Sequence, residues 1–116
     1  MSKNIHIQQL VDELKKVSSQ NKADIWKRVA YDLEKSTRQR RIVNLSKISR
    51  YSSDDEVIVV PGKVLGSGEL NKKVTIAAYQ ISEQAADKVK QAKGTILTIA
   101  ELAKKNPKGN KIRIIG

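Results

Sequence analysis

The stretch "VIVVPGKVLGSGEL", from Val57 to Leu70, sets an apolar run against a glycine-rich turn, and its reading decides the fold. Four apolar residues that are followed by Pro61 and Gly62 predict a short buried strand ending at Val60. The segment "NKKVTIAAYQI" comes next, and its alternation predicts a second strand over residues 73–79. Two neighbouring strands around a glycine turn favour a domain with a sheet.

The glycine turn does not fit a nucleotide loop. A Walker loop has its lysine after the second glycine, whereas Lys63 follows the first one. A dinucleotide loop needs a third small residue where Asn71 stands, and both loops lead into a helix, which the strand-like segment does not supply. Two interpretations remain: a plain hairpin turn, or a loop in which Gly62, Gly66 and Gly68 let bare backbone approach some other phosphate.

Composition indicates a small domain with a polyanionic partner. The 116 residues hold 39% hydrophobic residues, enough for one core. Lys and Arg number 23 against 12 Asp and Glu, a formal net charge of +11, which creates a field that attracts nucleic acid. No apolar stretch approaches the length of a membrane span or the core of a signal peptide, so a cytoplasmic location is expected.

Residues for catalysis or metal binding are scarce. The absence of cysteine excludes disulfides, thiol catalysis and thiolate-bound zinc. The one histidine, His6, is expected to be solvated, and the acids of "SSDDEV", residues 52–57, to form a solvated turn. The sequence therefore predicts no enzyme activity and no cofactor.

Two amphipathic helices are expected at the N-terminus. Apolar residues recur every three or four positions over residues 5–18, and again over residues 23–36, where Trp26 lies on the apolar stripe. The polar segment "SSQNK" between them predicts a helical hairpin. Trp26, Tyr31 and Tyr79 are interpreted as core residues rather than as platforms for stacked bases.

A basic tract without acids follows, from Thr37 to Ser53, and there the helical period fails. Arginine dominates, and its planar guanidinium matches phosphate oxygens in a bidentate manner. Interleaved apolar residues would hold the tract against the body, and Asn44, Ser46 and Ser49 would add neutral donors. The alternative is a solvated surface run; nucleic-acid contact is favoured, through Arg38, Arg40, Arg41, Asn44, Lys47 and Arg50.

The rest of the chain alternates between strand and helix. Ser82 is a plausible N-cap for a helix through Gln91 that is stopped by Gly94. A strand "GTILTI" follows, then a short helix for which Thr98 and Glu101 have the capping-box spacing. With a terminal strand around residues 112–115, the order after residue 56 is strand, strand, helix, strand, helix, strand.

Four motifs resemble a known family. "RRIVNLSKI", "PGKVLGSGEL", "VTIAAYQISEQA" and "ELAKKNPKGNKIRII" are similar, in that order, to motifs of the archaeal and eukaryotic large-subunit ribosomal protein family L eighteen e. The resemblance covers nearly the whole chain. It implies an α/β fold, in which an N-terminal helical hairpin and a basic extended tract precede a compact, irregular β-β-α core shared with bacterial ribosomal protein fifteen.

The resemblance also implies a function. It implies a structural constituent of the large ribosomal subunit that binds ribosomal RNA, has neighbouring ribosomal proteins as partners, and lacks catalysis, a small-molecule substrate and a membrane association. In such a protein the glycine turn and the compact half would bring further contacts to RNA, through Lys63, Ser67, Lys72, Lys73, Lys108 and Lys111.

The sequence also predicts how the chain is divided, and it leaves two alternative functions. Residues 1–36 are expected to form the hairpin, 37–56 the basic tract with the acidic turn, and 57–116 the α/β core, as one structural unit. One rival is a free basic protein that binds DNA or messenger RNA. The other is a nucleotide-dependent enzyme, which the glycine spacing disfavours.

Overall fold

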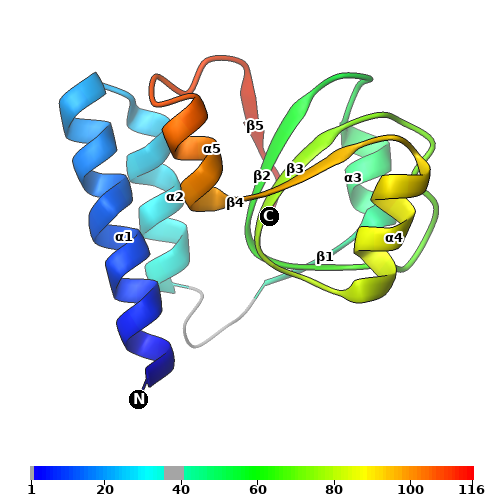
Figure 1. The fold of residues 1–116 in the computed structure, drawn as a ribbon, viewed down its shortest axis with the longest axis horizontal. Helices are drawn as coiled ribbons and strands as arrows, with labels where there is room; N and C mark the ends of the chain where they lie inside the picture. Colours follow the sequence, from blue (N-terminus) through cyan, green and yellow to red (C-terminus); the bar gives the residue numbers. More distant parts are fainter. Residues whose placement is uncertain (1, 36–40) are drawn as a thin grey trace.

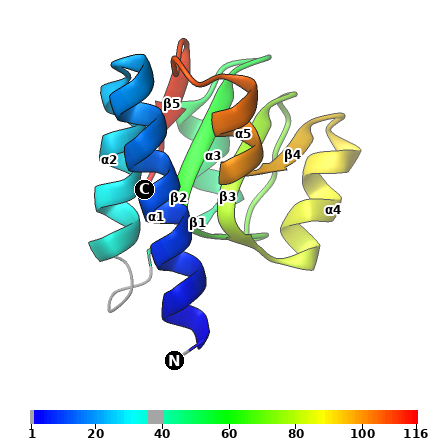
Figure 2. The ribbon, with the colours of Figure 1, turned by 60° about the vertical axis from the view of Figure 1, so that its left-hand side comes forward.

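A parallel sheet lies between two layers of helices in the computed structural model, which describes residues 2–35 and 41–116, with side chains from Ile7 onward (Figures 1 and 2). The α/β class expected from the sequence is confirmed. No helix in this described part is long and apolar enough to cross a membrane. The elements are α1 (Ser2–Asn21), α2 (Asp24–Lys35), β1 (Ile42–Asn44), α3 (Leu45–Tyr51), β2 (Val57–Leu65), β3 (Thr75–Ile81), α4 (Glu83–Gln91), β4 (Thr95–Thr98), α5 (Ile99–Lys105) and β5 (Ile112–Ile114).

The N-terminal hairpin forms as predicted. α1 and α2 pack along each other and against one face of the sheet, because their apolar stripes are buried together with α5. Trp26 is fully buried in this cluster, as expected, and Tyr79 packs partly against it. The expectation for Tyr31 was wrong: it lies on the outer side of α2 and is 56% exposed.

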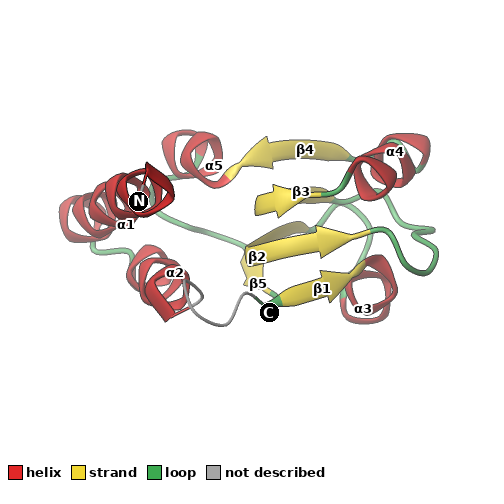
Figure 3. Ribbon diagram, turned by 90° about the horizontal axis from the view of Figure 1, so that it is seen from below, coloured by secondary structure: helices red, strands yellow, loops and turns green. Residues whose placement is uncertain are grey.

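The sheet has all its neighbouring strands parallel, in the order β1-β2-β3-β4, with β5 also paired to β2 (Figure 3). β1 pairs with Lys63–Leu65, and β5 pairs with Val57–Val59. Because β1 and β5 pair with opposite ends of β2, both of these three-residue strands lie along the same edge of β2. Alternate residues of β2 then serve two cores, Ile58 and Val60 on the α3/α4 face and Val59 on the hairpin face.

The expected end of the strand at Pro61 and Gly62 was wrong, since β2 continues to Leu65. The pairing with β3 shifts between Val60 and Lys63, so that β2 gains an extra residue and forms a bulge. A bulge tolerates proline, because no ladder hydrogen bond is required of its nitrogen. Gly62 is needed at this bulge: a Cβ there would lie 2.5 Å from the carbonyl oxygen of Arg41.

The interpretation of the glycine turn as a plain hairpin was wrong as well. A hairpin joins antiparallel strands, whereas β2 and β3 pair in parallel. Residues 66–74 therefore return across the end of the sheet, and Leu70 and Val74 anchor this connection by burial in the α3/α4 core. The sequence does not indicate this parallel connection, because no helix lies between β2 and β3.

Part of the basic tract is regular where no helical period was found. Residues 42–44 form β1, and residues 45–51 form α3, which buries only Leu45 and Ile48. Two apolar residues three apart are too few to establish a period over seven residues. Tertiary burial of this pair, rather than amphipathic patterning, fixes the helix.

The capping residues seen in the sequence correctly predicted the starts of α4 and α5. The Ser82 hydroxyl accepts a hydrogen bond from the Ala85 amide at the start of α4. The capping box of α5 is complete, with Thr98 and Glu101 each bonding the other's backbone amide. The strand and helix order after residue 56 is confirmed.

Candidate nucleic-acid interface

Six of the predicted site residues lie on α3 and on the backbone that borders it. Arg41 precedes β1 and Asn44 is its last residue; β1 pairs with the end of β2 that carries Lys63, and the turn with Ser67 contacts the start of α3. We name this region the α3 surface; it consists of Arg41, Asn44, Lys47, Arg50, Lys63 and Ser67. Arg38 and Arg40 lie outside the described residues.

The glycine turn holds the N-terminal end of α3. The Ser46 amide donates to the Ser67 carbonyl at 3.1 Å. Gly68 has φ +92°, and a Cβ on it would lie 2.5 Å from the Cβ of Ser46, so glycine permits both the backbone conformation and the approach to the helix. Of the glycines in this turn, Gly68 is the one with a backbone angle that favours glycine.

Lys88 of α4 fixes the other side of this turn. Its ammonium donates to the carbonyls of Gly66 and Gly68, at 2.7 and 2.8 Å. These carbonyls would otherwise present negative dipoles beside the α3 surface. Sequence reasoning missed Lys88, because nothing in α4 itself indicates a partner about twenty residues upstream.

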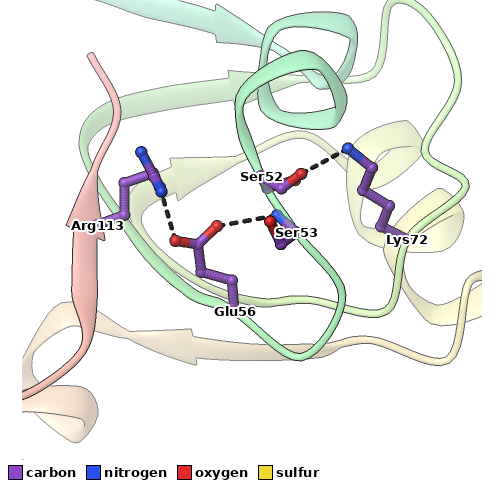
Figure 4. A network of polar contacts seen from close by, with 5 residues as sticks. All are labelled: Ser52, Ser53, Glu56, Lys72 and Arg113. Atoms are coloured by element: carbon purple, nitrogen blue, oxygen red, sulfur yellow. Dashed lines mark hydrogen bonds and ion pairs between the residues drawn. The ribbon is translucent and has the colours of Figure 1, made fainter.

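Lys72 holds the C-terminal end of α3 (Figure 4). Its ammonium donates to the carbonyls of Ser49 and Ser52, at 2.6 and 2.5 Å, which are acceptors left free at the end of the helix. Lys72 was predicted to bind RNA, and the structure directs its charge to this intramolecular cap instead of outward. Between Lys72 and the glycine turn, α3 is secured at both ends.

The outward side of α3 is basic and aromatic. Lys47 and Arg50 are exposed, and Tyr51 beside them is 54% exposed. The Arg50 guanidinium lies 6.0 Å from the centroid of the Tyr51 ring, near the limit of a cation–π contact. Tyr51 was not singled out in the sequence; its exposed ring beside a cation is suited to stacking on an unpaired base. Asn44 is the N-cap residue of α3, yet its side chain makes no capping bond.

The remaining predicted lysines lie elsewhere. Lys73 is exposed beside the acidic turn, where its ammonium lies 3.9 Å from Asp55. Lys111 lines a hollow with the acids of that same turn. Lys108 is exposed on the loop between α5 and β5. The structure therefore places Lys73 and Lys111 at the acidic turn and Lys108 on the loop after α5, and none of the three belongs to α3.

An ion pair fixes the acidic turn to β5 (Figure 4). The Arg113 Nε donates to Glu56 at 2.7 Å, and the Ser53 amide donates to the other carboxylate oxygen at 2.9 Å. The bond from the Arg113 guanidinium is the main cause, and the Ser53 amide the second, that holds the pKa of Glu56 below its ordinary value. The Glu56 side chain is only 19% exposed, although its sequence neighbourhood was expected to be a solvated turn.

This ion pair predicts an acid-sensitive contribution to stability. Because the folded pKa of Glu56 is lowered, the contribution is present at neutral pH and is lost as pH falls from about 4.5, the ordinary value, through the folded value. Arg113→Gln should lower the free energy of unfolding by about 0.5–1 kcal/mol at pH 7, since Arg113 is half exposed. Urea unfolding at pH 7 and at pH 3 checks this: the difference between variant and wild type should shrink at pH 3. An equal difference at both pH values would contradict it.

The arrangement is suited to holding phosphates. Among the described residues, Arg41, Lys47, Arg50 and Lys63 have no carboxylate within ion-pair distance, so their charges remain available to a ligand. The same described part contains no group of three or more metal-binding side chains. Cations on a fixed helix, with serine and asparagine beside them, offer ion pairs and hydrogen bonds to a sugar–phosphate backbone.

Comparisons with known proteins agree with the resemblance seen in the sequence. Residues 1–116 match the family described as "Ribosomal protein 60S L18 and 50S L18e". A protein of Methanococcus maripaludis named large ribosomal subunit protein eL18 is 47% identical over 115 residues, which cover 99% of this chain and 96% of that protein. Proteins of the same name from Methanoregula boonei and Archaeoglobus fulgidus are 48% and 46% identical over 112 residues, covering 97% of this chain and 93% and 96% of theirs.

Proposed function

This chain belongs to the family of ribosomal protein 60S L18 and 50S L18e, and from this membership we propose that it binds large-subunit ribosomal RNA through the α3 surface. It is a structural constituent of the large ribosomal subunit, acting in the cytoplasm within the ribosome, and not an enzyme. Its partners are ribosomal RNA and neighbouring ribosomal proteins. The RNA contacts proposed next concern this chain's own residues.

The observation that carries the proposal is the fixed position of α3. A seven-residue helix is too short to be stable alone, yet α3 is secured by the glycine turn at one end and by Lys72 at the other. Internal contacts thus hold a helix whose outward residues, Lys47 and Arg50, have no carboxylate partner among the described residues. Because the backbone that carries these charges is already ordered, phosphate binding does not require the entropy cost of ordering it.

The mode of binding follows from the shape of RNA. A-form RNA has a major groove too narrow for side chains, so a small basic protein recognises mainly phosphates, 2′-hydroxyls and local shape. Arg41 and Arg50 would bind phosphates in a bidentate manner, while Lys47 and Lys63 would act as point charges. Tyr51 would stack on an unpaired base. The expected result is a stabilised RNA fold rather than readout of sequence.

The rivals are less well supported. A free DNA- or messenger-RNA-binding protein would use the same charges, but family membership favours the ribosome. A nucleotide-dependent enzyme would need an open glycine turn whose backbone amides can approach phosphates. Here Lys88 binds the turn from one side and α3 covers it from the other.

Chemical footprinting tests the proposal. Large-subunit ribosomal RNA should show protected backbone positions when the protein is added, and a tenfold excess of ATP or GTP should not remove them. Apparent affinity should fall steeply between 50 and 200 mM salt, because each neutralised phosphate releases counterions. Binding that is equally tight to unrelated duplex DNA would favour the rival free basic protein.

A further inference from the structure

A second basic surface lies on the opposite face of the sheet from α3. α2 and α5 are buried in the core on one face, and α3 in the core on the other. The turn between α1 and α2 and the loop after α5 meet at the upper end of the hairpin in Figure 1. We name this region the hairpin-end surface; it consists of Lys22, Lys27, Lys104 and Lys108, all exposed.

Trp26 holds the two segments of this surface together. Its indole Nε1 lies 3.3 Å from the carbonyl oxygen of Asn106 and 3.0 Å from that of Pro107, so that one N–H serves two carbonyls of the loop. Gly109, with φ +68°, lies so close to α2 that a Cβ would meet the side chain of Ile25. The loop is thereby fixed on the start of α2.

The loop also has its own hydrogen bonds. The Asn106 side chain donates to the Asn110 carbonyl at 2.9 Å and accepts from the Asn110 amide at 3.3 Å. The Gly109 amide donates to the Asn106 carbonyl at 3.0 Å. A surface loop with this much internal bonding is rigid, and it presents Lys108 to solvent in a fixed position.

The charges of this surface lack internal partners. Within the described chain, no carboxylate lies within ion-pair distance of its four lysines. The nearby acids are few: Asp24 lines a hollow of about 650 Å³ with Lys22 and Lys27, and Glu101 interacts with Lys105. The net charge of the region is therefore positive, which favours an anionic partner.

We propose that the hairpin-end surface binds the phosphate backbone of a second RNA segment, separate from the one on α3. This inference rests on the proposed function, because it assumes that RNA surrounds the protein. The two surfaces lie on opposite faces of the sheet, in a molecule with extents of 35 × 32 × 18 Å, so a single backbone stretch would have to wrap around the molecule to reach both. The protein then joins two RNA segments across its sheet.

RNA fits this surface better than an acidic protein does. Protein interfaces have apolar or aromatic anchors at their centre. The exposed large hydrophobic residues of the described chain are Tyr31, Ile42 and Tyr51, and none belongs to the hairpin-end surface. All four of its cations are lysines, which act as point charges and suit phosphates without demanding a fixed geometry.

Directed cleavage tests the inference in assembled large subunits. The chain has no cysteine, so Lys108→Cys and Lys47→Cys each provide a single site for tethering an iron chelate that cleaves nearby RNA. Both variants should incorporate into subunits. We expect Lys108→Cys to cleave one RNA region and Lys47→Cys to cleave another, with no shared positions.

A salt titration with the 116-residue chain gives an independent measurement. Lys27→Gln/Lys108→Gln should reduce the slope of log affinity against log salt by about 1–2. The matched control, Lys90→Gln/Lys93→Gln on exposed positions of α4 and the turn after it, should leave the slope unchanged. Equal slopes for both double variants would overturn the inference, provided that melting temperatures match.

Each outcome of the cleavage experiment is informative. If only Lys47→Cys cleaves RNA, or if both variants cleave the same strand, the inference fails and the proposed function stands. If the chelate at position 108 cleaves a neighbouring protein and no RNA, the inference fails and the partner of this surface is a protein. If neither variant cleaves RNA, the proposed function fails together with the inference.

Discussion

Trp26→Ala should lower the free energy of unfolding by about 3–5 kcal/mol, the usual cost of truncating a fully buried tryptophan. The side chain fills the core between α1, α2 and α5, and its N–H serves two loop carbonyls that would lose this donor. A domain of this size has about 5–15 kcal/mol in total, so the loss should shift the melting temperature by ten degrees or more. Thermal unfolding followed by circular dichroism measures it.

A second variant separates packing from hydrogen bonding at this position. Trp26→Phe keeps an aromatic ring but removes the donor to Asn106 and Pro107. It should cost less than alanine, and amide exchange should accelerate chiefly in residues 106–110. A loss of less than about 1 kcal/mol for Trp26→Ala would contradict its place in the core.

Removing the outward charges of the α3 surface should have the largest effect on RNA binding. Arg41→Gln/Lys47→Gln/Arg50→Gln deletes three cations that have no carboxylate partner among the described residues. Affinity for a large-subunit RNA fragment should fall at least about tenfold, and the salt slope should decrease by about 3 if each cation meets one phosphate. Filter binding at several salt concentrations measures both quantities.

A control of equal charge identifies the location of the effect. Lys16→Gln/Lys90→Gln/Lys93→Gln removes three exposed lysines that belong to α1, to α4 and to the turn after α4. Its affinity should change far less, and both triple variants should melt within a few degrees of the wild type, because glutamine preserves most of the side-chain stems. Similar losses of affinity in the two variants would show that binding depends on net charge alone.

The helices with end signals could be predicted from the sequence, because their determinants are local. Ser82 and Thr98 cap α4 and α5 with their own hydroxyls, and the stripe that includes Trp26 is long enough to show a helical period. Long-range contacts left no such trace. α3 depends on the burial of two residues, and the parallel pairing of β2 with β3 depends on Leu70 and Val74, which sequence patterns do not connect.

The candidate site could be predicted only as a tract of charge. The density of basic residues located Lys47 and Arg50, which are exposed on α3, and Arg41, which is exposed just before β1. Residue type alone does not identify a lysine that binds RNA, because an ammonium can donate to a backbone carbonyl as well as to a phosphate. Lys72 and Lys88 do so, and in both cases the partner carbonyls lie about twenty residues upstream.

The position of β5 beside the first half of β2 bears on how the chain matures during translation. Val57–Val59 emerge about fifty residues before Ile112–Ile114, which pair with them. At elongation rates of about 5–20 residues per second, this edge of β2 stays open for roughly 3–10 s, with unpaired amides and carbonyls on an apolar strand. The nascent domain is thus most prone to associate with other chains in that interval, and synthesis of the last strand closes it.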